Sequence, residues 1–419
     1  MKKLFHNIEV SPVISIHGNP IKGVNHCAGP IWPDFDNAGF ARHHWGSSRG
    51  PVDVEPSSQA DIATHLKGLY IYGGCIYPHF GHFISEFTSR LFPAVLEHPD
   101  ARVIYVSRDS SIPDFISQIF SLFGISERIL IVYQPVILEK LIVYKQAEVW
   151  GYAPHPELTY LEMLSSSLSR AGICSAVNKN KYLFVSRANM AAGRFIAENY
   201  LERCFADLGF RIFRPEEHSL ADQVQTYLNF ENIIFSEGSA AHCLQLMGKI
   251  DANVIVLSRR SNRKQFPDDF LKSRVKNLKY FDLILVKIGA ASDSGEQLNF
   301  TDIVLLDIQD LLYMISNEFH LPVKQAIESH HSNLKNYSEL VYGDIKRILS
   351  LWSKADIFSN LESQKRVFYG LLALPCLNFS QKIYLIREFF YSNKDFLFFL
   401  ISIFTSKFYK KVVNFFYLR

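Results

Sequence analysis

A histidine and a glutamate in the first quarter of the chain have the types and the spacing to move a proton. His82 and Glu86 are four residues apart, and the apolar residues from position 83 onward recur at intervals of three and four, which predicts an amphipathic helix. Residues four apart share a helix face, so the two side chains can hydrogen-bond to each other. Either one could then act as a general base, with the other as its orienting partner. The alternative is a structural polar pair on a core helix.

The segment before this pair predicts the elements that position it. Gly73 and Gly74 follow an apolar pair, and His79 and Gly81 precede the helical pattern. This order predicts a strand, then a loop that glycine allows to turn, and then the helix. Reactive groups of α/β enzymes often lie at such a turn.

Length and composition indicate a large globular protein. The 419 residues are 48% hydrophobic and 20% charged, which favours two domains over one. The net charge of +3 does not indicate a nucleic-acid partner. The 6 cysteines have no close pairing, which is typical of buried thiols in a reducing compartment rather than of disulfides or a zinc site. Two lysines near the N-terminus have no apolar stretch behind them, so no secretory signal is expected and we predict a cytoplasmic protein.

Apolar segments and helical patterns alternate in the first half. Residues 1–65 are rich in glycine, proline and aspartate, which predicts short strands and long loops. The strands expected after them are 102–106, 129–132 and 141–144, and the helices are 112–123 and 158–171. The polar stretch 175–181 is where we place a domain junction.

The alternation repeats after that junction. The expected strands are 182–186, 211–213, 232–236 and 253–257, and the expected helices are 197–208, 220–229 and 240–247. Short apolar strands in strict turn with helices indicate a parallel sheet covered on both faces. We therefore predict an α/β protein with two Rossmann-like domains facing a cleft, residues 1–174 and 175–320, followed by a helical extension, residues 321–419. Ligands should bind at the carboxyl ends of the strands.

Two arginines lie at one of those strand ends. Arg187 directly follows an expected strand, and Arg194 lies seven residues further on. Guanidinium groups can hold a diphosphate through forked, charge-assisted hydrogen bonds, so the pair could clamp a nucleotide. The alternative is a pair of ordinary surface arginines.

Two further strand ends carry candidate ligand groups. Glu216 follows the second strand of the later half, ahead of a helix that Ser219 can cap. Gly238, Ser239 and Ala240 follow the third strand and open a helix, where backbone N–H groups with small side chains beside them can bind phosphate oxygens. The phosphate-binding lysine motif of nucleoside triphosphatases and the common dinucleotide motif are both absent.

Four segments in this order, HFGHFISEFTSRL, FVSRANMAAGR, FRPEEHSLADQ and SEGSAAH, resemble the catalytic domain of glycosyltransferase family 61, including its bacterial polysaccharide-biosynthesis members. The similarity covers about residues 70–260. It implies an inverting transferase of the GT-B type that uses nucleotide-sugar donors, usually without a bound metal. Many members have a histidine before the glycine where this chain has Glu237.

The resemblance also divides the site residues between the two domains. On the donor side it places Arg187, Arg194, Glu216, Glu237, Gly238, Ser239, Ala240 and His242. On the acceptor side it places His79, Gly81 and Arg90 beside the candidate catalytic residues His82 and Glu86.

The sequence also has a candidate metal motif and a candidate membrane segment. Asp34 and Asp36 form a DxD pair, an arrangement that holds a divalent cation in some glycosyltransferases; a loop whose aspartates bind no metal is the alternative, and we expect a metal-independent enzyme. Residues 394–419 mix aromatic residues with lysines, and their apolar run is too short to span a bilayer. This composition suits an anionic membrane surface, although a buried helix pair would have the same composition.

Together these features predict the transfer of a sugar from a nucleotide diphosphate to a hydroxyl of a glycan acceptor. The acceptor would be a surface glycan such as capsule, O-antigen or lipopolysaccharide, free or lipid-linked, made at the inner face of the cytoplasmic membrane. Two alternatives remain at this point. One is a non-catalytic protein that binds a nucleotide sugar or glycan, and the other is a sugar-phosphate transferase.

Overall fold

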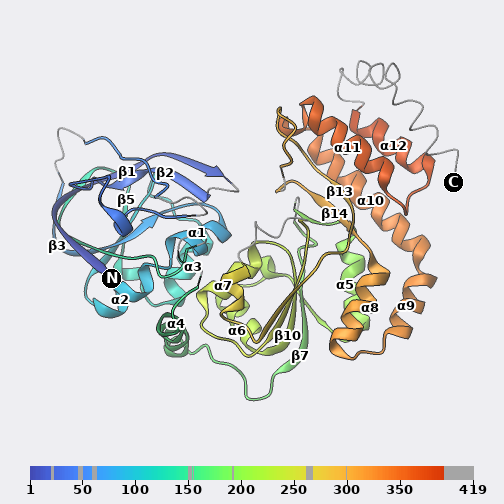
Figure 1. The fold of residues 1–419 in the computed structure, drawn as a ribbon, viewed down its shortest axis with the longest axis horizontal. Helices are drawn as coiled ribbons and strands as arrows, with labels where there is room; N and C mark the ends of the chain where they lie inside the picture. Colours follow the sequence, from blue (N-terminus) through green and yellow to red (C-terminus); the bar gives the residue numbers. More distant parts are fainter. Residues whose placement is uncertain are drawn as a thin grey trace.

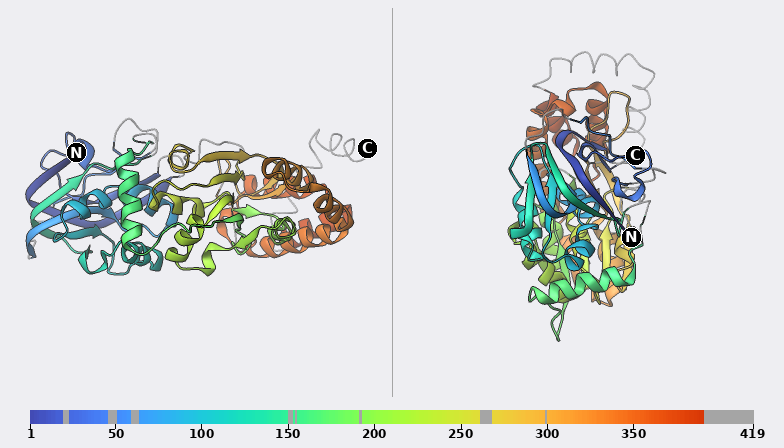
Figure 2. Two further views of the ribbon diagram at one scale, coloured as in Figure 1. Left: turned by 90° about the horizontal axis from the view of Figure 1, so that it is seen from below. Right: turned by 90° about the vertical axis from the view of Figure 1, so that its left-hand side faces the viewer.

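The computed structural model describes residues 1–390 except 20–22, 46–50, 59–63, 150–152, 154, 191–192, 261–267 and 299. Three parts follow one another along its long axis: a first sheet with its helices, a second sheet, and a set of C-terminal helices (Figures 1 and 2). The predicted membrane segment, residues 394–419, lies outside the described residues. Among the described residues, the structure has no helix that is both long and apolar enough to cross a bilayer.

The first sheet is mixed, with the strand order β2-β1-β6-β3-β4-β5. Its strands are β1 (Lys2–Asn19), β2 (Gly23–Pro30), β3 (His65–Cys75), β4 (Arg102–Val106), β5 (Ile129–Val132) and β6 (Val136–Tyr144). Strands β3 to β6 pair in parallel, whereas β1 pairs antiparallel with both β2 and β6. The prediction of a parallel first sheet is thus correct only for its β3–β6 part.

The prediction of short strands and long loops in residues 1–65 is wrong for β1 and β2. Strand β1 is 18 residues long and buries Ile8, Val10 and Val13. Pro12 interrupts its sequence pattern, but the β1–β2 register shifts between Ser11 and Ser15. Such an irregularity in the ladder of hydrogen bonds allows a proline within a strand. Pro12, which in the sequence predicts the end of a strand, therefore lies inside the continuous strand β1.

The second sheet is entirely parallel, with the order β12-β11-β10-β7-β9. Its strands are β7 (Asn180–Val185), β9 (Arg211–Phe213), β10 (Phe230–Ser236), β11 (Asn253–Leu257) and β12 (Asn277–Phe281). A small third sheet contains β8 (Arg194–Phe195), β13 (Ile284–Ile288) and β14 (Ile303–Leu306). The later half is therefore a parallel α/β unit, as predicted.

The helices cover these sheets. Those of the first half are α1 (Phe80–Phe87), α2 (Leu91–Glu97), α3 (Asp114–Leu122) and α4 (Leu158–Arg170). Those of the second sheet are α5 (Glu198–Asp207), α6 (Leu220–Leu228) and α7 (Asp268–Lys272), with the 3-10 helices η3 (Pro215–Glu217) and η4 (Ser239–Leu246). The helix expected at 240–247 is thus a 3-10 helix. The C-terminal helices are α8 (Ile308–Phe319), α9 (Val323–Ser332), α10 (Leu334–Trp352), α11 (Leu361–Ala373) and α12 (Phe379–Phe390).

The two faces of the second sheet belong to different hydrophobic cores. Ile233 and Phe235 of β10 join a core that continues into the first sheet. Ile234, between them in the sequence, joins the core that contains α8 to α12. Because successive side chains of a strand point to opposite faces, one strand connects all three parts. One face of this sheet is thereby packed into the same core as the first half of the chain.

Candidate functional site

The carboxyl ends of three neighbouring strands, β10, β7 and β9, meet helix α1 of the first half. Strand β9 follows β7 in the chain and lies on one side of it, whereas β10 lies on the other side. After β7, the chain adds β9 on one side and then crosses to add β10 on the other side. Ligands of open α/β sheets bind where the order of strand addition reverses in this way. Arg187, Glu216 and Ser239 each follow one of these three strands and line the same pocket.

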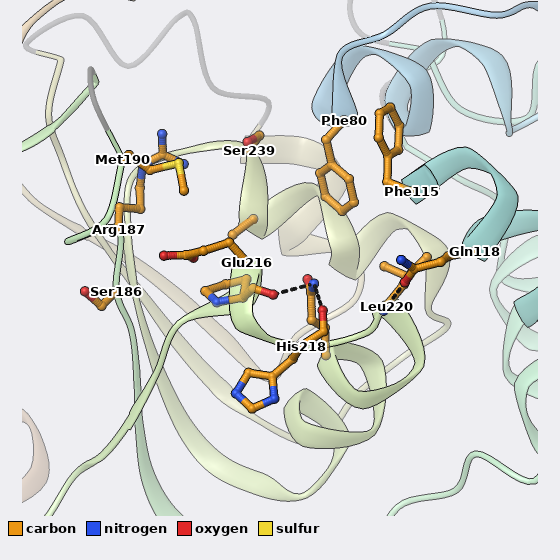
Figure 3. Close-up of a pocket in the computed structure, with 13 residues that line it drawn as sticks. Phe80, Phe115, Gln118, Ser186, Arg187, Met190, Glu216, His218, Leu220 and Ser239 are labelled. Atoms are coloured by element: carbon orange, nitrogen blue, oxygen red, sulfur yellow. Dashed lines mark hydrogen bonds between the residues drawn. The ribbon is translucent and has the colours of Figure 1, made fainter. Parts of the chain in front are cut away.

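This pocket has a volume of about 270 Å³. Its residues come from both halves of the chain (Figure 3): Phe80, Phe115 and Gln118 from the first, and Ser186, Arg187, Met190, Pro215, Glu216, His218, Leu220, Gln223, Ser239 and Ala240 from the second. The Phe80 and Phe115 rings lie edge to face with centroids 5.6 Å apart. Gln118 Oε1 accepts a hydrogen bond of 2.7 Å from the Leu220 amide, which ties the two walls together. The pocket thus combines an aromatic wall with a polar one.

Arg187 is the cation of the polar wall. Its Nε donates to the Gly193 carbonyl at 3.1 Å, and no carboxylate forms an ion pair with it in the described part of the chain. A Cβ at Gly238 would lie 2.2 Å from an Arg187 guanidinium nitrogen, so only glycine allows this arginine to lie where it does. Burial lowers the pKa of Arg187, and the charge of nearby Glu198 opposes that effect. The guanidinium still remains a cation at neutral pH.

Glu198, which the sequence reasoning did not single out, holds the backbone beneath this wall. Its carboxylate is fully buried and accepts hydrogen bonds from the Arg187 amide at 2.8 Å and from Ser236 Oγ at 2.5 Å. Burial raises its pKa. Glu198 therefore joins the ends of β7 and β10. In the sequence it resembles any acidic residue in the first turn of a helix, and only the sheet order reveals this contact.

Arg194 does not accompany Arg187 to the pocket. Its side chain is buried and forms an ion pair with Asp344 of α10. Asp344 also accepts a hydrogen bond of 2.9 Å from the Ala197 amide. The structure therefore does not assemble the predicted two-arginine clamp, because the second arginine already has a carboxylate partner.

The residues of the loop after β10 make two different sets of contacts. Glu237 is buried, and it accepts from the amides of Arg259 and Arg260 at 2.5 and 3.0 Å and pairs with the Arg260 side chain. It fastens the ends of β10 and β11 and does not line the pocket. Ser239 and Ala240 do line it, at the first turn of η4 after Gly238. The first N–H groups of a helix have no partner within it.

The predicted pair of His82 and Glu86 forms in the structure, but its glutamate is inaccessible. His82 Nδ1 hydrogen-bonds to Glu86 Oε1, and His43 Nε2 lies 3.0 Å from Glu86 Oε2. The amide of Val24 also donates to Oε2, at 3.1 Å. The side chain of Glu86 is 0% exposed, whereas that of His82 is 23% exposed. Only the histidine of the pair can therefore contact a substrate here.

Hydrogen bonds keep Glu86 ionised despite its burial. Burial raises the pKa of this carboxyl, but the hydrogen bonds from His43 and His82 outweigh burial and lower its pKa overall. His43 is the second residue that the sequence reasoning missed, because it lies in the glycine- and proline-rich stretch assigned to loops. Its ring stacks on Phe87, with centroids 4.7 Å apart. The one sequence feature that could have pointed to His43 is that it forms a doublet with His44.

The three predicted acceptor-side residues have different positions. His79 is the N-cap of α1, and its Nδ1 accepts from the His82 amide at 3.3 Å; burial lowers its pKa to about 4. Gly81 contacts His242 of η4, since a Cβ there would lie 2.8 Å from the His242 ring. Arg90 is buried and donates to the carbonyl of Ala41 at 3.0 Å. His79 and Gly81 thus lie where the two halves meet, and Arg90 lies in the interior.

The DxD pair forms a turn with its own neighbour. Asp34 Oδ1 accepts from the Asn37 amide at 3.1 Å, and the Asn37 side chain donates to both of its oxygens. Across the described residues, no group of three or more histidine, cysteine or acidic side chains could hold a metal ion. The residues that line the pocket instead provide a guanidinium and backbone amides.

The comparison with known protein families covers this site. No curated protein matches the chain. Residues 80–263 match the family model described as Glycosyltransferase 61. The match begins at Phe80 on the aromatic wall and includes the pair of His82 and Glu86, the ends of β7, β9 and β10, and η4. The resemblance seen in the four sequence segments is thereby confirmed, and this segment of the chain is similar to glycosyltransferase family 61.

Proposed function

We propose that the protein transfers a sugar, with inversion, from a nucleoside-diphosphate sugar to a hydroxyl of a glycan acceptor. The observation that carries this proposal is the position of two side chains: an arginine that forms no ion pair with a carboxylate of the described residues, and a histidine backed by a carboxylate. Arg187 lines the pocket at the strand ends, and His82 lies two residues after Phe80 of the same pocket, on α1. A candidate anion-binding group thus lines the cavity, and a candidate base lies on the helix that contributes Phe80 to it, within the segment that matches the family model.

A single-step inverting transfer requires these two groups. The acceptor hydroxyl must lose a proton as it attacks, and the departing diphosphate must be stabilised as its charge develops. Arg187 and the first-turn amides of η4 would stabilise the diphosphate, because a guanidinium and helix N–H groups both bind phosphate oxygens. No metal is required for that step. A GT-B arrangement, with the donor at the second sheet and the acceptor at α1, fits this division of roles.

We assign the base to His82 and the orienting role to Glu86. The carboxylate accepts the Nδ1 hydrogen of His82, so that the proton-accepting nitrogen is Nε2. Glu86 then stabilises the imidazolium that forms when His82 takes the acceptor proton. His43 holds the other carboxylate oxygen, which fixes the orientation of Glu86. Of the two candidates that the sequence left open, the exposed one is thereby preferred.

The test is to identify the products. A thermal-shift screen over nucleoside diphosphates and nucleotide sugars selects the donor, and the enzyme is then incubated with that donor and glycan acceptors. We expect free nucleoside diphosphate and a glycoside whose anomeric configuration, read by NMR, is opposite to that of the donor. Release of nucleoside monophosphate would instead show a sugar-phosphate transferase. A thermal shift without any released nucleotide would show a binding protein.

We also propose that the protein acts at the inner face of the cytoplasmic membrane, on a surface glycan or lipid-linked acceptor. This proposal rests on the lysines and aromatic residues of 394–419. Deleting these residues should abolish sedimentation with anionic liposomes and leave the thermal shift by the donor unchanged. An insoluble truncated protein would show that the segment belongs to the core.

A further inference from the structure

The pocket at the strand ends has two sides of different chemistry. In Figure 3, Arg187 and Met190 lie on one side of it, and the rings of Phe80 and Phe115 lie on the other. Its volume of about 270 Å³ is below the ~300–1,000 Å³ of cavities that enclose a whole small-molecule ligand. The pocket therefore suits one portion of a ligand, with an anionic group at the arginine and an apolar group at the rings.

Among the described residues that line this pocket, Glu216 is the acidic one. It is exposed and forms no hydrogen bond or ion pair with any residue that the structure describes. Its neighbour Glu217 accepts hydrogen bonds from Asn189 at 3.0 Å and from Arg214 at 3.3 Å, and it lines a neighbouring hollow instead. Of these two adjacent carboxylates, Glu216 is therefore the one whose oxygens can bind a ligand in the pocket.

The backbone around Glu216 is held by Gln223 of α6. Gln223 Nε2 donates to the carbonyl of Pro215 at 2.9 Å and to that of His218 at 3.2 Å (Figure 3). These two carbonyls lie on either side of Glu216 in the sequence, and Gln223 is buried. The turn that presents the carboxylate is therefore formed before a ligand arrives, which reduces the entropy lost on binding.

The charge of Glu216 restricts what it can bind. Burial lowers the pKa of Arg187, and the charges of Glu198 and Glu216 oppose that effect, so Glu216 lies near the arginine that would hold the diphosphate. A carboxylate only accepts hydrogen bonds, and it repels phosphate. Glu216 must therefore face hydrogen-bond donors of the ligand. In a nucleotide, the donors next to the diphosphate are the 2′ and 3′ hydroxyls of ribose, and two neighbouring hydroxyls match the two oxygens of one carboxylate.

The place of Glu216 in the second sheet agrees with a contact to ribose. Arg187 follows β7, and Glu216 follows β9, which is the next strand of this sheet in the chain and pairs with β7. In dinucleotide-binding α/β folds, an acidic residue beyond the phosphate-binding turn hydrogen-bonds the 2′ hydroxyl of the ribose. The spacing of phosphate-binding and acidic groups across the strand ends is thus of the kind that holds a ribose phosphate.

The other side of the pocket is suited to a planar base. Phe80 of α1 and Phe115 of α3 are only partly buried, and both rings line the pocket. Aromatic side chains bind nucleobases by stacking, with little dependence on which base it is. Both rings come from the first half of the chain, so a base bound here would join the two halves.

We propose that this pocket binds the nucleoside of the donor, with Glu216 accepting hydrogen bonds from the 2′ and 3′ hydroxyls of ribose and with Phe80 and Phe115 packing on the base. Glu216 then selects ribonucleotide sugars over deoxyribonucleotide sugars, because a 2′-deoxy donor lacks one of the hydroxyls that the carboxylate binds. This inference rests on the proposed function, since it assigns further parts of the same donor.

Calorimetry with UDP, GDP, ADP and CDP, each compared with its 2′-deoxy analogue, tests the role of Glu216. The two members of a pair differ by one oxygen atom. For the pair that binds most tightly, the wild-type protein should bind the deoxy form at least about tenfold more weakly, as for one lost hydrogen bond to a charged group. E216A should bind both forms about equally. E217A, which changes the adjacent carboxylate outside the pocket, should keep the wild-type preference.

Other outcomes separate this inference from the proposed function. Equal binding of the two forms by the wild-type protein would overturn the contact with ribose and leave the proposed function standing. A preference that persists in E216A would overturn the role of Glu216, because another residue would then bind the 2′ hydroxyl. The comparison is made within one protein, so a general loss of affinity does not affect it. If the wild-type protein binds none of these nucleotides, the proposed function fails and this inference fails with it.

The aromatic side of the pocket is tested with F80L and F115L. Each variant removes a ring, keeps an apolar side chain and should weaken the tightest-binding nucleoside diphosphate by up to about tenfold. F123L, at the C-terminal end of the same helix α3 and outside the pocket, is the control. Since Phe115 also contacts Phe83 of the core, F80L decides if F115L does not fold. Wild-type affinity in F80L and in folded F115L would overturn the placement of the base.

Discussion

His82 and His242 approach the contact between the two halves of the molecule from opposite sides, and the groups behind them differ. Glu86 contacts His82 directly and is held from behind by a third histidine, His43. Behind His242 an amide, Gln245, stands between the ring and the carboxylate of Glu148. The two arrangements differ in how strongly they stabilise a second proton on the imidazole ring.

A carboxylate in direct contact stabilises an imidazolium, whereas an intervening amide adds only a neutral acceptor. His82 is therefore suited to gain and lose a proton during turnover. His242, with its pKa lowered to about 4 by burial, is suited to remain neutral. The difference shows how two histidines in one site can be given separate roles by the residue behind each ring.

The largest expected effect comes from removing the proposed base, His82. H82A should lower kcat by about 10² to 10⁴-fold, the usual value of general-base catalysis, with donor affinity nearly unchanged. E86Q should lower kcat by less, because it removes the orienting charge and retains the ring. Steady-state kinetics and calorimetry measure both quantities, with the exposed His155 replaced by alanine as the control.

A larger loss in E86Q than in H82A would return the role of base to the glutamate. Wild-type turnover in both variants would mean that α1 holds only a structural polar pair, and the comparison between the two histidines would then have no catalytic meaning.

The two arginines predicted to act together should have separate effects. R194A leaves the Asp344 carboxylate without its buried partner, which should cost about 3–5 kcal/mol of unfolding free energy. R187A should instead weaken nucleotide binding by about 1.5–3 kcal/mol and change stability little. Urea unfolding and calorimetry separate the two effects, and R211A, at the opposite end of β9, is the control. If R194A instead bound the nucleotide more weakly and kept its full stability, the predicted two-arginine clamp would be supported.

The lowered pKa of His242 predicts a pH-dependent stability. The folded ring takes its proton at a pKa of about 4, and the unfolded ring takes it near the ordinary value of about 6.5. As the pH falls from about 6.5 to about 4, the unfolded state binds a proton that the folded state does not, so stability is lost over that interval. The unfolding free energy of H242F should fall less steeply with pH over this interval. The difference in slope should correspond to the binding of up to about one proton fewer on unfolding. Parallel curves for the two proteins would contradict the buried neutral ring.

The smallest expected effect is that of a chelator. Because Arg187 and backbone amides can stabilise a diphosphate without a cation, activity should survive EDTA. A complete loss of activity that Mn²⁺ or Mg²⁺ restores would assign a catalytic role to Asp34 and Asp36 instead.

Local spacing was sufficient to predict several parts of the site. The helix that carries His82 and Glu86 follows from an i, i+4 pattern, and the hydrogen bond between them needs only that helix. The parallel second sheet follows from alternating strands and helices, and it brings Arg187, Glu216 and Ser239 to one pocket because parallel strands end at the same edge. Each of these predictions depends on residues close together in the sequence.

Contacts between distant residues were decided only by the tertiary structure. Arg194 is withdrawn from the pocket by Asp344, 150 residues later, and Glu148 reaches Gln245 across 97 residues. His43 reaches Glu86 only because the chain that follows strands β1 and β2 of the first sheet returns to α1, in a stretch where the sequence had predicted short strands and long loops.

The difference in burial between His82 and Glu86 then distinguishes two roles, base and orienting partner, that the sequence left open. The same i, i+4 pair allowed either residue to be the base, but Glu86 lies at 0% exposure while His82 reaches the surface. A helical pattern states which side chains share a face. It does not state how deeply that face is covered, because the covering residues come from elsewhere in the chain.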